Sequence, residues 1–147
     1  MDGVAKTVPA SPLVDAVSNA PEAQVDLRTM LRGRPTLVVL WATWCEACRD
    51  EFAALNRLDA ALAEHEGLVV AIAVGDDVQK VRGVVAGQRL RYAQLVDPEF
   101  QFSDALGVRR VPTNLVVDRT GRIVHVGGAL DAATLAAFRA QLHGDAH

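Results

Sequence analysis

The chain has 147 residues, of which half are hydrophobic and 22% are charged. This composition indicates one globular domain and excludes a largely disordered chain. The net charge of −3 gives no support for nucleic-acid binding. The longest apolar runs are far shorter than the roughly 20 residues that a membrane-spanning helix needs. We therefore expect neither a nucleic-acid partner nor a membrane span in this chain.

The N-terminal segment, residues 1–23, is rich in Ala, Pro and Ser and lacks a cationic start followed by a long apolar stretch. As written, it is not a signal peptide, and we expect a loosely ordered lead-in to a domain spanning residues 24–147. Two locations stay open. The chain acts in the cytoplasm if Met1 is the native start, and in the periplasm or another extracytoplasmic space if a signal or anchor was removed.

The first half of the domain predicts two strands followed by a helix. Val25 and Leu27 alternate with polar residues, which favours a short strand. The continuous β-rich apolar run at 36–41 is typical of a central strand that is buried on both faces. From Glu46 to about His65, apolar residues recur at spacings of three and four with charges between them, which predicts an amphipathic helix.

The second half continues the alternation of strands and helices. It predicts a strand at 67–74, a helix at 76–90, a strand at 92–97, a helix at 98–107, a hairpin of strands at 113–118 and 122–127, and a final helix at 131–142. Gly121 suits the hairpin turn, and Asp131 is the expected N-cap of the final helix. Parallel units followed by a terminal antiparallel hairpin imply an α/β fold with a mixed sheet between helices.

The chain has two cysteines, Cys45 and Cys48, placed where the apolar strand pattern gives way to the helical pattern. A thiolate at a helix start is stabilised by unpaired backbone N–H groups, so the thiol pKa falls. Cys48 lies three residues on, on the same helical face, where it can attack a mixed disulfide formed at Cys45. The spacing therefore predicts Cys45 as the nucleophile and Cys48 as the resolving thiol of a redox-active disulfide.

Two other interpretations of the cysteines remain open. A structural zinc site needs four ligands, and one C-x-x-C supplies two. The four histidines, at positions 65, 125, 143 and 147, are not spaced to complete it locally. Inert core cysteines are the other interpretation, since buried free cysteine is common.

The sequence around the cysteines resembles the thioredoxin superfamily. "WCEAC" preceded by "LVVLWAT" is similar to its strand–active-site–helix unit, and "VPT" at 111–113, followed by hairpin strands and "VGG", is similar to its cis-proline segment. "RGRPTLVVLWATWCEACRDEFAAL" is most similar to the TlpA/ResA/CcmG branch of exported thiol–disulfide oxidoreductases. The resemblance implies a thioredoxin fold, a mixed sheet flanked by helices, with a helix–strand insertion within residues 75–107.

The resemblance also implies a substrate-binding rim around the dithiol. Pro112 is expected to follow a cis peptide bond and to face the cysteines, and the backbone of Val111 could pair with an extended substrate segment. Trp44 is expected to shield the sulfur atoms, and Trp41 either shares that role or belongs to the core. Glu46 directly follows the nucleophile.

Several positions depart from the family pattern. Val39 occupies the place where thioredoxins carry a buried acid, so proton transfer at Cys48 needs another group. Glu51 matches the branch's acid three residues after the second cysteine and is the candidate, with a surface glutamate paired to an arginine as the alternative. Ala47 and Ala53 replace prolines of many relatives, which predicts a less kinked helix.

We interpret the chain as a thiol–disulfide oxidoreductase that acts on protein disulfides. The branch implies a reductant, with an upstream electron donor and a substrate such as an apocytochrome c or a copper-site protein. No cofactor or metal is expected, because the cysteines carry the electrons, and a monomer is expected. The alternatives are a thiol peroxidase, whose P-x-x-x-T-x-x-C motif is absent before Cys45, and a Cu(I)-binding dithiol module, which no methionine cluster supports.

Overall fold

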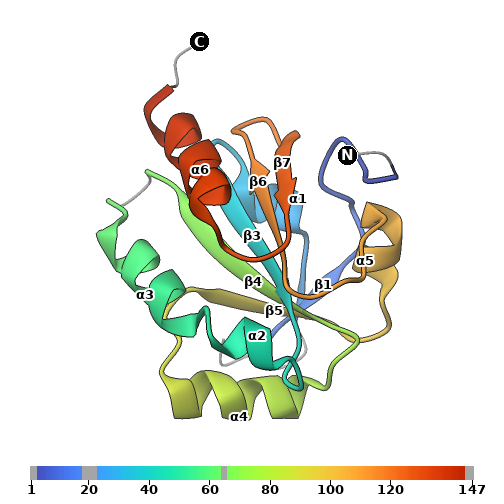
Figure 1. The fold of residues 1–147 in the computed structure, drawn as a ribbon. Helices are drawn as coiled ribbons and strands as arrows, with labels where there is room; N and C mark the ends of the chain where they lie inside the picture. Colours follow the sequence, from blue (N-terminus) through green and yellow to red (C-terminus); the bar gives the residue numbers. More distant parts are fainter. Residues whose placement is uncertain (1–2, 18–22, 64–65, 145–147) are drawn as a thin grey trace.

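The computed structural model describes residues 3–17, 23–63 and 66–144 (Figure 1). A seven-stranded mixed sheet with the order β2-β1-β5-β4-β3-β6-β7 forms its centre. The strands are β1 (Leu13–Asp15), β2 (Gln24–Val25), β3 (Thr36–Trp41), β4 (Leu68–Val74), β5 (Ala93–Asp97), β6 (Thr113–Val117) and β7 (Ile123–Gly127). The helices are α1 (Leu27–Leu31), α2 (Glu46–Arg49), α3 (Phe52–Ala61), α4 (Val78–Gln88), α5 (Gln101–Leu106) and α6 (Ala132–Gly144). The predicted α/β class is therefore confirmed.

The middle of the sheet matches the sequence pattern closely. Strand β3 covers the apolar run at 36–41, and every one of its residues is buried. It pairs in parallel with β4 and antiparallel with β6, while β5 is parallel to β4. A strand that is covered on both faces needs apolar residues at every position, which explains the unbroken run. The carboxyl end of β3 leads directly into the cysteines.

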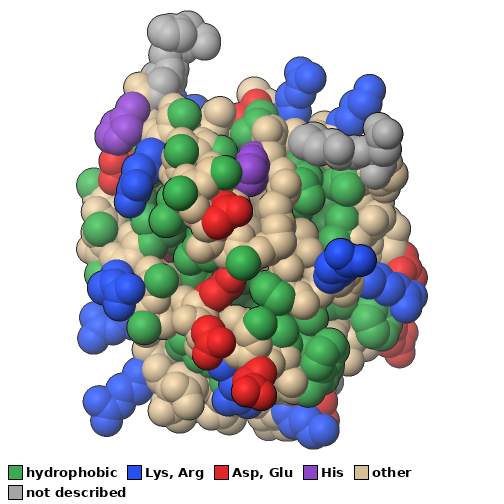
Figure 2. Space-filling model, viewed as in Figure 1, with side chains coloured by type: hydrophobic (Ala, Val, Ile, Leu, Met, Phe, Trp, Pro, Cys, Tyr) green, Lys and Arg blue, Asp and Glu red, His purple; other side chains and the backbone are tan. Residues whose placement is uncertain are grey.

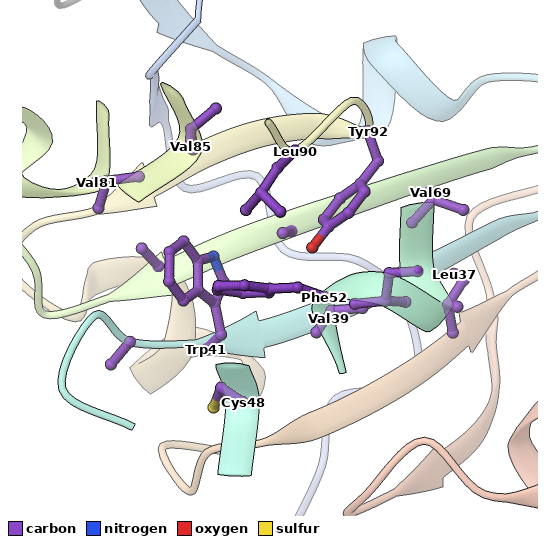
Figure 3. Close-up of a cluster of buried hydrophobic side chains, with 14 of the residues drawn as sticks. Leu37, Val39, Trp41, Cys48, Phe52, Val69, Val81, Val85, Leu90 and Tyr92 are labelled. Carbon is purple, nitrogen blue, oxygen red and sulfur yellow. The ribbon is translucent and has the colours of Figure 1, made fainter. Parts of the chain in front are cut away.

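Two apolar clusters lie on the two faces of the sheet. One contains both cysteines together with buried side chains from α3, α4 and α6, among them Phe52, Val81 and Phe138. Figure 3 shows this side of the core, where the indole ring of Trp41 lies against Phe52. The other cluster lies under α1 and α5. The dithiol therefore lies on the face of the sheet that α3, α4 and α6 cover.

The N-terminal segment differs from the expectation of a loosely ordered lead-in. In its described part, strand β1 pairs antiparallel with β5, joining Val14 to Val96 and Asp15 to Leu95. Leu13 is fully buried and Val8 is 4% exposed. A strand of three residues carries too little periodicity to be recognised among prolines, so the composition of the segment concealed it. Residues 1–2 and 18–22 lie outside the described residues.

The expected strand around Val25 and Leu27 is shorter than predicted. Strand β2 ends at Val25, and Leu27 begins α1. The cause is Asp26, whose side chain caps the helix by accepting a hydrogen bond from the Arg28 N–H. An aspartate cap before an apolar residue starts a helix where alternation alone suggested a strand.

The helix after the cysteines is broken, which contradicts the expectation of one continuous helix from Glu46 to about His65. Helix α2 ends at Arg49, and α3 begins at Phe52. Between them the Glu51 N–H donates a 3.1 Å hydrogen bond to the Cys48 carbonyl, three residues back. This tighter turn interrupts the α-helical pattern without a proline. The predicted end near His65 lies outside the described residues, and α3 ends at Ala61.

The remaining elements follow the predicted order. Residues 75–107, where an insertion was expected, contain α4, β5 and α5. Helix α5 begins three residues after Pro98, because the Asp97 carboxylate accepts hydrogen bonds from the N–H groups of Phe102 and Ser103. Gly121 has a positive φ of 91° in the hairpin turn, as predicted. Asp131 caps α6 by accepting from the Thr134 N–H at 2.9 Å.

Candidate active site

Cys45 and Cys48 form a disulfide at the start of α2, with their Cα atoms 5.3 Å apart. Cys45 is the N-cap residue of this one-turn helix. Its Sγ accepts a hydrogen bond of 3.2 Å from the Cys48 N–H, which is the helix-start stabilisation expected for this sulfur. Cys45 is 6% exposed and Cys48 is 2% exposed. Cys45 is therefore the more accessible of two largely buried sulfur atoms.

The loop that leads into the cysteines is held at its centre, Thr43. The Thr43 N–H and hydroxyl donate to the Asp76 carboxylate at 2.7 and 3.1 Å, just beyond β4. The Arg49 guanidinium donates to the Thr43 carbonyl, at 2.9 Å from Nη2. These bonds connect the loop to Asp76, just beyond β4, and to α2. They therefore fix the backbone that leads into the disulfide.

The two tryptophans next to the cysteines have different environments. Trp41 is 1% exposed and packs edge-to-face on Phe52 with ring centroids 5.4 Å apart. It shares a cluster with both cysteines, and its Nε1 has no hydrogen-bond partner among the described residues. Trp44 is 74% exposed. Trp41 therefore belongs to the core, which was the alternative expected for it, whereas Trp44 presents an apolar ring to solvent next to Cys45 in the chain.

The expected substrate-binding residues differ in exposure, and Val111 packs against the apolar cluster that contains both cysteines. Val111 and Pro112 are half-buried, and the peptide bond between them is cis, as the resemblance implies. Glu46 is exposed. Figure 2 shows acidic side chains across the middle of the face that carries α2, with lysines and arginines mostly towards its edges. Acidic side chains therefore predominate in the middle of this face.

Glu51 is buried at 9% exposure, which contradicts the alternative of a surface glutamate. Its Oε2 accepts a 2.7 Å hydrogen bond from the Leu130 N–H, in the segment that precedes α6. Burial raises the pKa of this carboxyl above its usual value, and the Leu130 N–H and the Asn114 side chain partly oppose the rise. Its Oε1 has no partner of standard geometry among the described residues. The direction of the shift agrees with the role expected for this residue.

Asn114 and Leu130 are parts of the site that the sequence did not identify. Asn114 is fully buried on β6, and its Nδ2 donates to the Gly128 carbonyl at 2.6 Å. A polar residue inside the apolar strand pattern of 113–117 was the available signal. Leu130 contributes only its backbone N–H, which no side-chain pattern can indicate.

The described part of the chain contains no group of three or more His, Cys, Asp or Glu residues that could hold a metal ion. His125 is half-buried, and its Nε2 lies 3.0 Å from the Thr134 hydroxyl. Among the described helices, none is both long enough and apolar enough to cross a bilayer.

Comparison with known proteins points to the same group of redox proteins. The chain is 26% identical over 96 residues to the thiol-disulfide oxidoreductase ResA of Bacillus subtilis, covering 65% of this chain and 54% of the relative. It is 35% identical over 108 residues to the thiol:disulfide interchange protein DsbE of Escherichia coli K12, covering 71% of this chain and 55% of the relative. The chain thus spans little more than half the length of these curated relatives.

The fold and the family are shown by two further matches. A solved structure of a thioredoxin-like protein from Porphyromonas gingivalis superposes with a TM-score of 0.76 at 23% identity, covering 95% of this chain and 94% of that one. The fold is therefore thioredoxin-like, as the resemblance implied. The sequence profile of the AhpC/TSA family matches residues 6–126. The chain belongs to the AhpC/TSA family, within its TlpA/ResA/CcmG-like thioredoxin branch.

Proposed function

We propose that this protein is a thiol–disulfide oxidoreductase that reduces protein disulfides through Cys45 and Cys48. The observation that carries the proposal is the Cys45–Cys48 disulfide, with the more exposed sulfur at the start of α2 and the second one behind it. Two relatives support it, one described as the thiol-disulfide oxidoreductase ResA and the other as the thiol:disulfide interchange protein DsbE.

The reaction balances as two successive exchanges. The Cys45 thiolate attacks one sulfur of the substrate disulfide, which forms a mixed disulfide and releases the first substrate thiolate. The Cys48 thiolate then attacks the Cys45 sulfur, which closes the Cys45–Cys48 disulfide and releases the second substrate thiolate. Two electrons pass to the substrate, and a dithiol donor returns the protein to its reduced state by the reverse sequence.

We propose that Glu51 exchanges the proton of Cys48. The two residues share one turn, since the Glu51 N–H is bonded to the Cys48 carbonyl. A carboxyl group whose pKa is raised by burial accepts a thiol proton more readily than an exposed glutamate does. We assign Glu51 the role of taking the proton when the disulfide closes and returning it when the disulfide opens.

The exposed surface around the dithiol suits a protein substrate. Trp44 offers a large apolar ring to a partner, and Val111 and Pro112 are accessible. The branch that the sequence resembles is exported, so we propose an extracytoplasmic site of action. Reduction rather than oxidation of the substrate also follows from this branch.

The test is a pair of single cysteine variants. Cys45→Ser should abolish insulin reduction, because the attacking sulfur is lost. Cys48→Ser should accumulate a mixed disulfide with the substrate, because the first attack survives and the second does not. Mass spectrometry of the trapped species identifies the attached cysteine. A mixed disulfide on Cys48 in the Cys45→Ser variant, with none on Cys45 in Cys48→Ser, would reverse the two roles.

A further inference from the structure

Two buried amide side chains mark the ends of a row that crosses the sheet below the site. The strand register pairs Gln94 with Ala71, Ala71 with Val39, and Val39 with Asn114. Val39 and Ala71 belong to the cluster that contains the cysteines, so the row lies on the face of the dithiol. Both amides are almost fully buried, with Asn114 at 0% and Gln94 at 1% exposure. A buried amide on an apolar face needs a partner.

Asn114 has a fixed orientation. Its Nδ2 donates a 2.6 Å hydrogen bond to the Gly128 carbonyl, which assigns the nitrogen to that side of the amide. Its Oδ1 has no partner among the described residues. The second N–H of the same nitrogen remains available to a neighbouring acceptor. The side chain is thus anchored at the segment before α6 and can still donate once.

Glu51 is anchored at the same segment as this amide. Its Oε2 is occupied by the Leu130 N–H, two residues after Gly128, while its Oε1 has no donor of standard geometry in the described structure. The Asn114 side chain lowers the pKa of Glu51 as a hydrogen-bond donor, against the larger effect of burial. One short segment, 128–130, therefore anchors both the carboxyl group and the amide beside it.

We propose that Asn114 is a positioning residue for Glu51: held by the Gly128 carbonyl beside the Leu130 N–H that binds Glu51, its remaining amide N–H stabilises the carboxylate form that accepts the proton of Cys48. The part of this inference that concerns the proton of Cys48 rests on the proposed function. An apolar residue at this position would leave Glu51 protonated to a higher pH, where it could no longer accept a proton. With the Asn114 amide in place, the buried Glu51 carboxyl group can still release and accept a proton.

The charged and titratable groups around Glu51 do not replace this amide. Asp50, from the turn between α2 and α3, acts on Glu51 as a like charge. Tyr92, before β5, is a buried phenol whose pKa is raised by burial and, to a smaller extent, by Glu51. Asp131 is exposed and caps α6. None of these three groups favours the carboxylate form of Glu51, which leaves the Leu130 N–H and Asn114 as its stabilising partners.

The test is the titration of the Glu51 carboxyl group in the oxidised protein, followed by ¹³C NMR with glutamate labelling and assigned by its loss in Glu51→Gln. Asn114→Leu removes the amide at similar volume and should raise the midpoint by about one pH unit. Gln94→Met is the matched control, because it removes the other buried amide of the same row, which lies beside Tyr92. It should leave the midpoint unchanged. An unchanged midpoint in Asn114→Leu, or an equal shift in both variants, would overturn the proposal.

A second measurement ties the effect to Glu51. Asn114→Leu should move the pH–rate profile of disulfide closure upward, and the same substitution in a Glu51→Gln background should not move it. An equal movement in both backgrounds would show that Asn114 does not act through Glu51. If Asn114→Leu does not fold, Asn114→Ala is measured with the same expected direction. The titration does not depend on turnover, so a failed oxidoreductase activity in the wild-type protein would be recognised separately.

Discussion

The Leu130 N–H donates a 2.7 Å hydrogen bond to the Glu51 Oε2, joining residues that are 79 positions apart in the sequence. This bond connects the turn after the cysteines to the segment that precedes α6. It holds a carboxyl group inside the protein, where burial raises its pKa. The buried carboxyl group that we propose as the proton acceptor is thus created by tertiary structure, in a chain whose β3 strand carries Val39 instead of an acid.

Glu51→Gln should slow the closing of the disulfide by about a hundredfold, at the lower end of general acid–base effects. The amide cannot take the Cys48 proton, so the mixed disulfide should accumulate. Stopped-flow oxidation of the reduced protein between about pH 5 and about pH 9 measures this step. Glu99→Gln is the control, since Glu99 is an exposed carboxylate in the segment before α5 and is not among the groups that act on Glu51. Identical pH–rate profiles for wild type and Glu51→Gln would mean that the proton passes through solvent.

The raised pKa of Glu51 also predicts a pH dependence of stability. The folded protein holds this proton more tightly than the unfolded chain, so the contribution of Glu51 to the free energy of unfolding falls as pH rises from the unfolded value of 4.5 towards the folded value. Glu51→Gln removes this loss. The difference in unfolding free energy, variant minus wild type, should therefore be more positive at neutral pH than at about pH 4. Urea unfolding of the oxidised proteins measures it, and a pH-independent difference would contradict the assignment.

Glu46 follows the nucleophile directly and is exposed. Its negative charge disfavours a thiolate at Cys45, so Glu46→Gln should lower the Cys45 pKa and make the couple more oxidising. Thiolate absorbance during a pH titration of the reduced protein measures the change, and added salt should reduce it. Glu99→Gln, an exposed glutamate in the segment before α5, serves as the control. If Glu46→Gln and wild type titrate identically, the carboxylate is screened by solvent.

Truncation of Trp44 should mainly change the reaction rate, whereas truncation of Trp41 should mainly lower the stability of the fold. Trp44→Ala should change stability by no more than about 0.5 kcal/mol, because the side chain is 74% exposed. It should slow the reaction with a protein disulfide and leave the reaction with a small disulfide unaffected. Trp41→Ala should cost about 3–5 kcal/mol of stability through the cavity it leaves. An equal loss of rate for Trp44→Ala with both substrates would exclude a docking role.

The elements with strong local patterns could be predicted from the sequence. The apolar run of β3, the hairpin turn at Gly121 and the cap at Asp131 each carry a signal in adjacent residues, and the structure confirms them. The C-x-x-C spacing likewise indicated a disulfide at the start of a helix. Local propensity and turn chemistry determine these features.

The features that depend on distant contacts could not be predicted. Strand β1 has three residues and is defined by its pairing with β5. The break between α2 and α3 occurs without proline or glycine, in a turn that places Glu51 under the Leu130 N–H. The role of Asn114 depends on a carbonyl 14 residues away. In each case the partner lies on another element, and no local pattern encodes it.

The reduction potential of the Cys45–Cys48 couple tests the central claim most directly. Equilibration in dithiothreitol redox buffers, followed by quantification of free thiols, gives this value. We expect a reversible two-electron transition with a midpoint below about −220 mV, the upper end of the cytosolic glutathione range and consistent with a reductant of protein disulfides. A midpoint near about −120 mV, the range of a strong oxidase, would contradict the direction of electron transfer. A disulfide that does not open reversibly would contradict the oxidoreductase function itself.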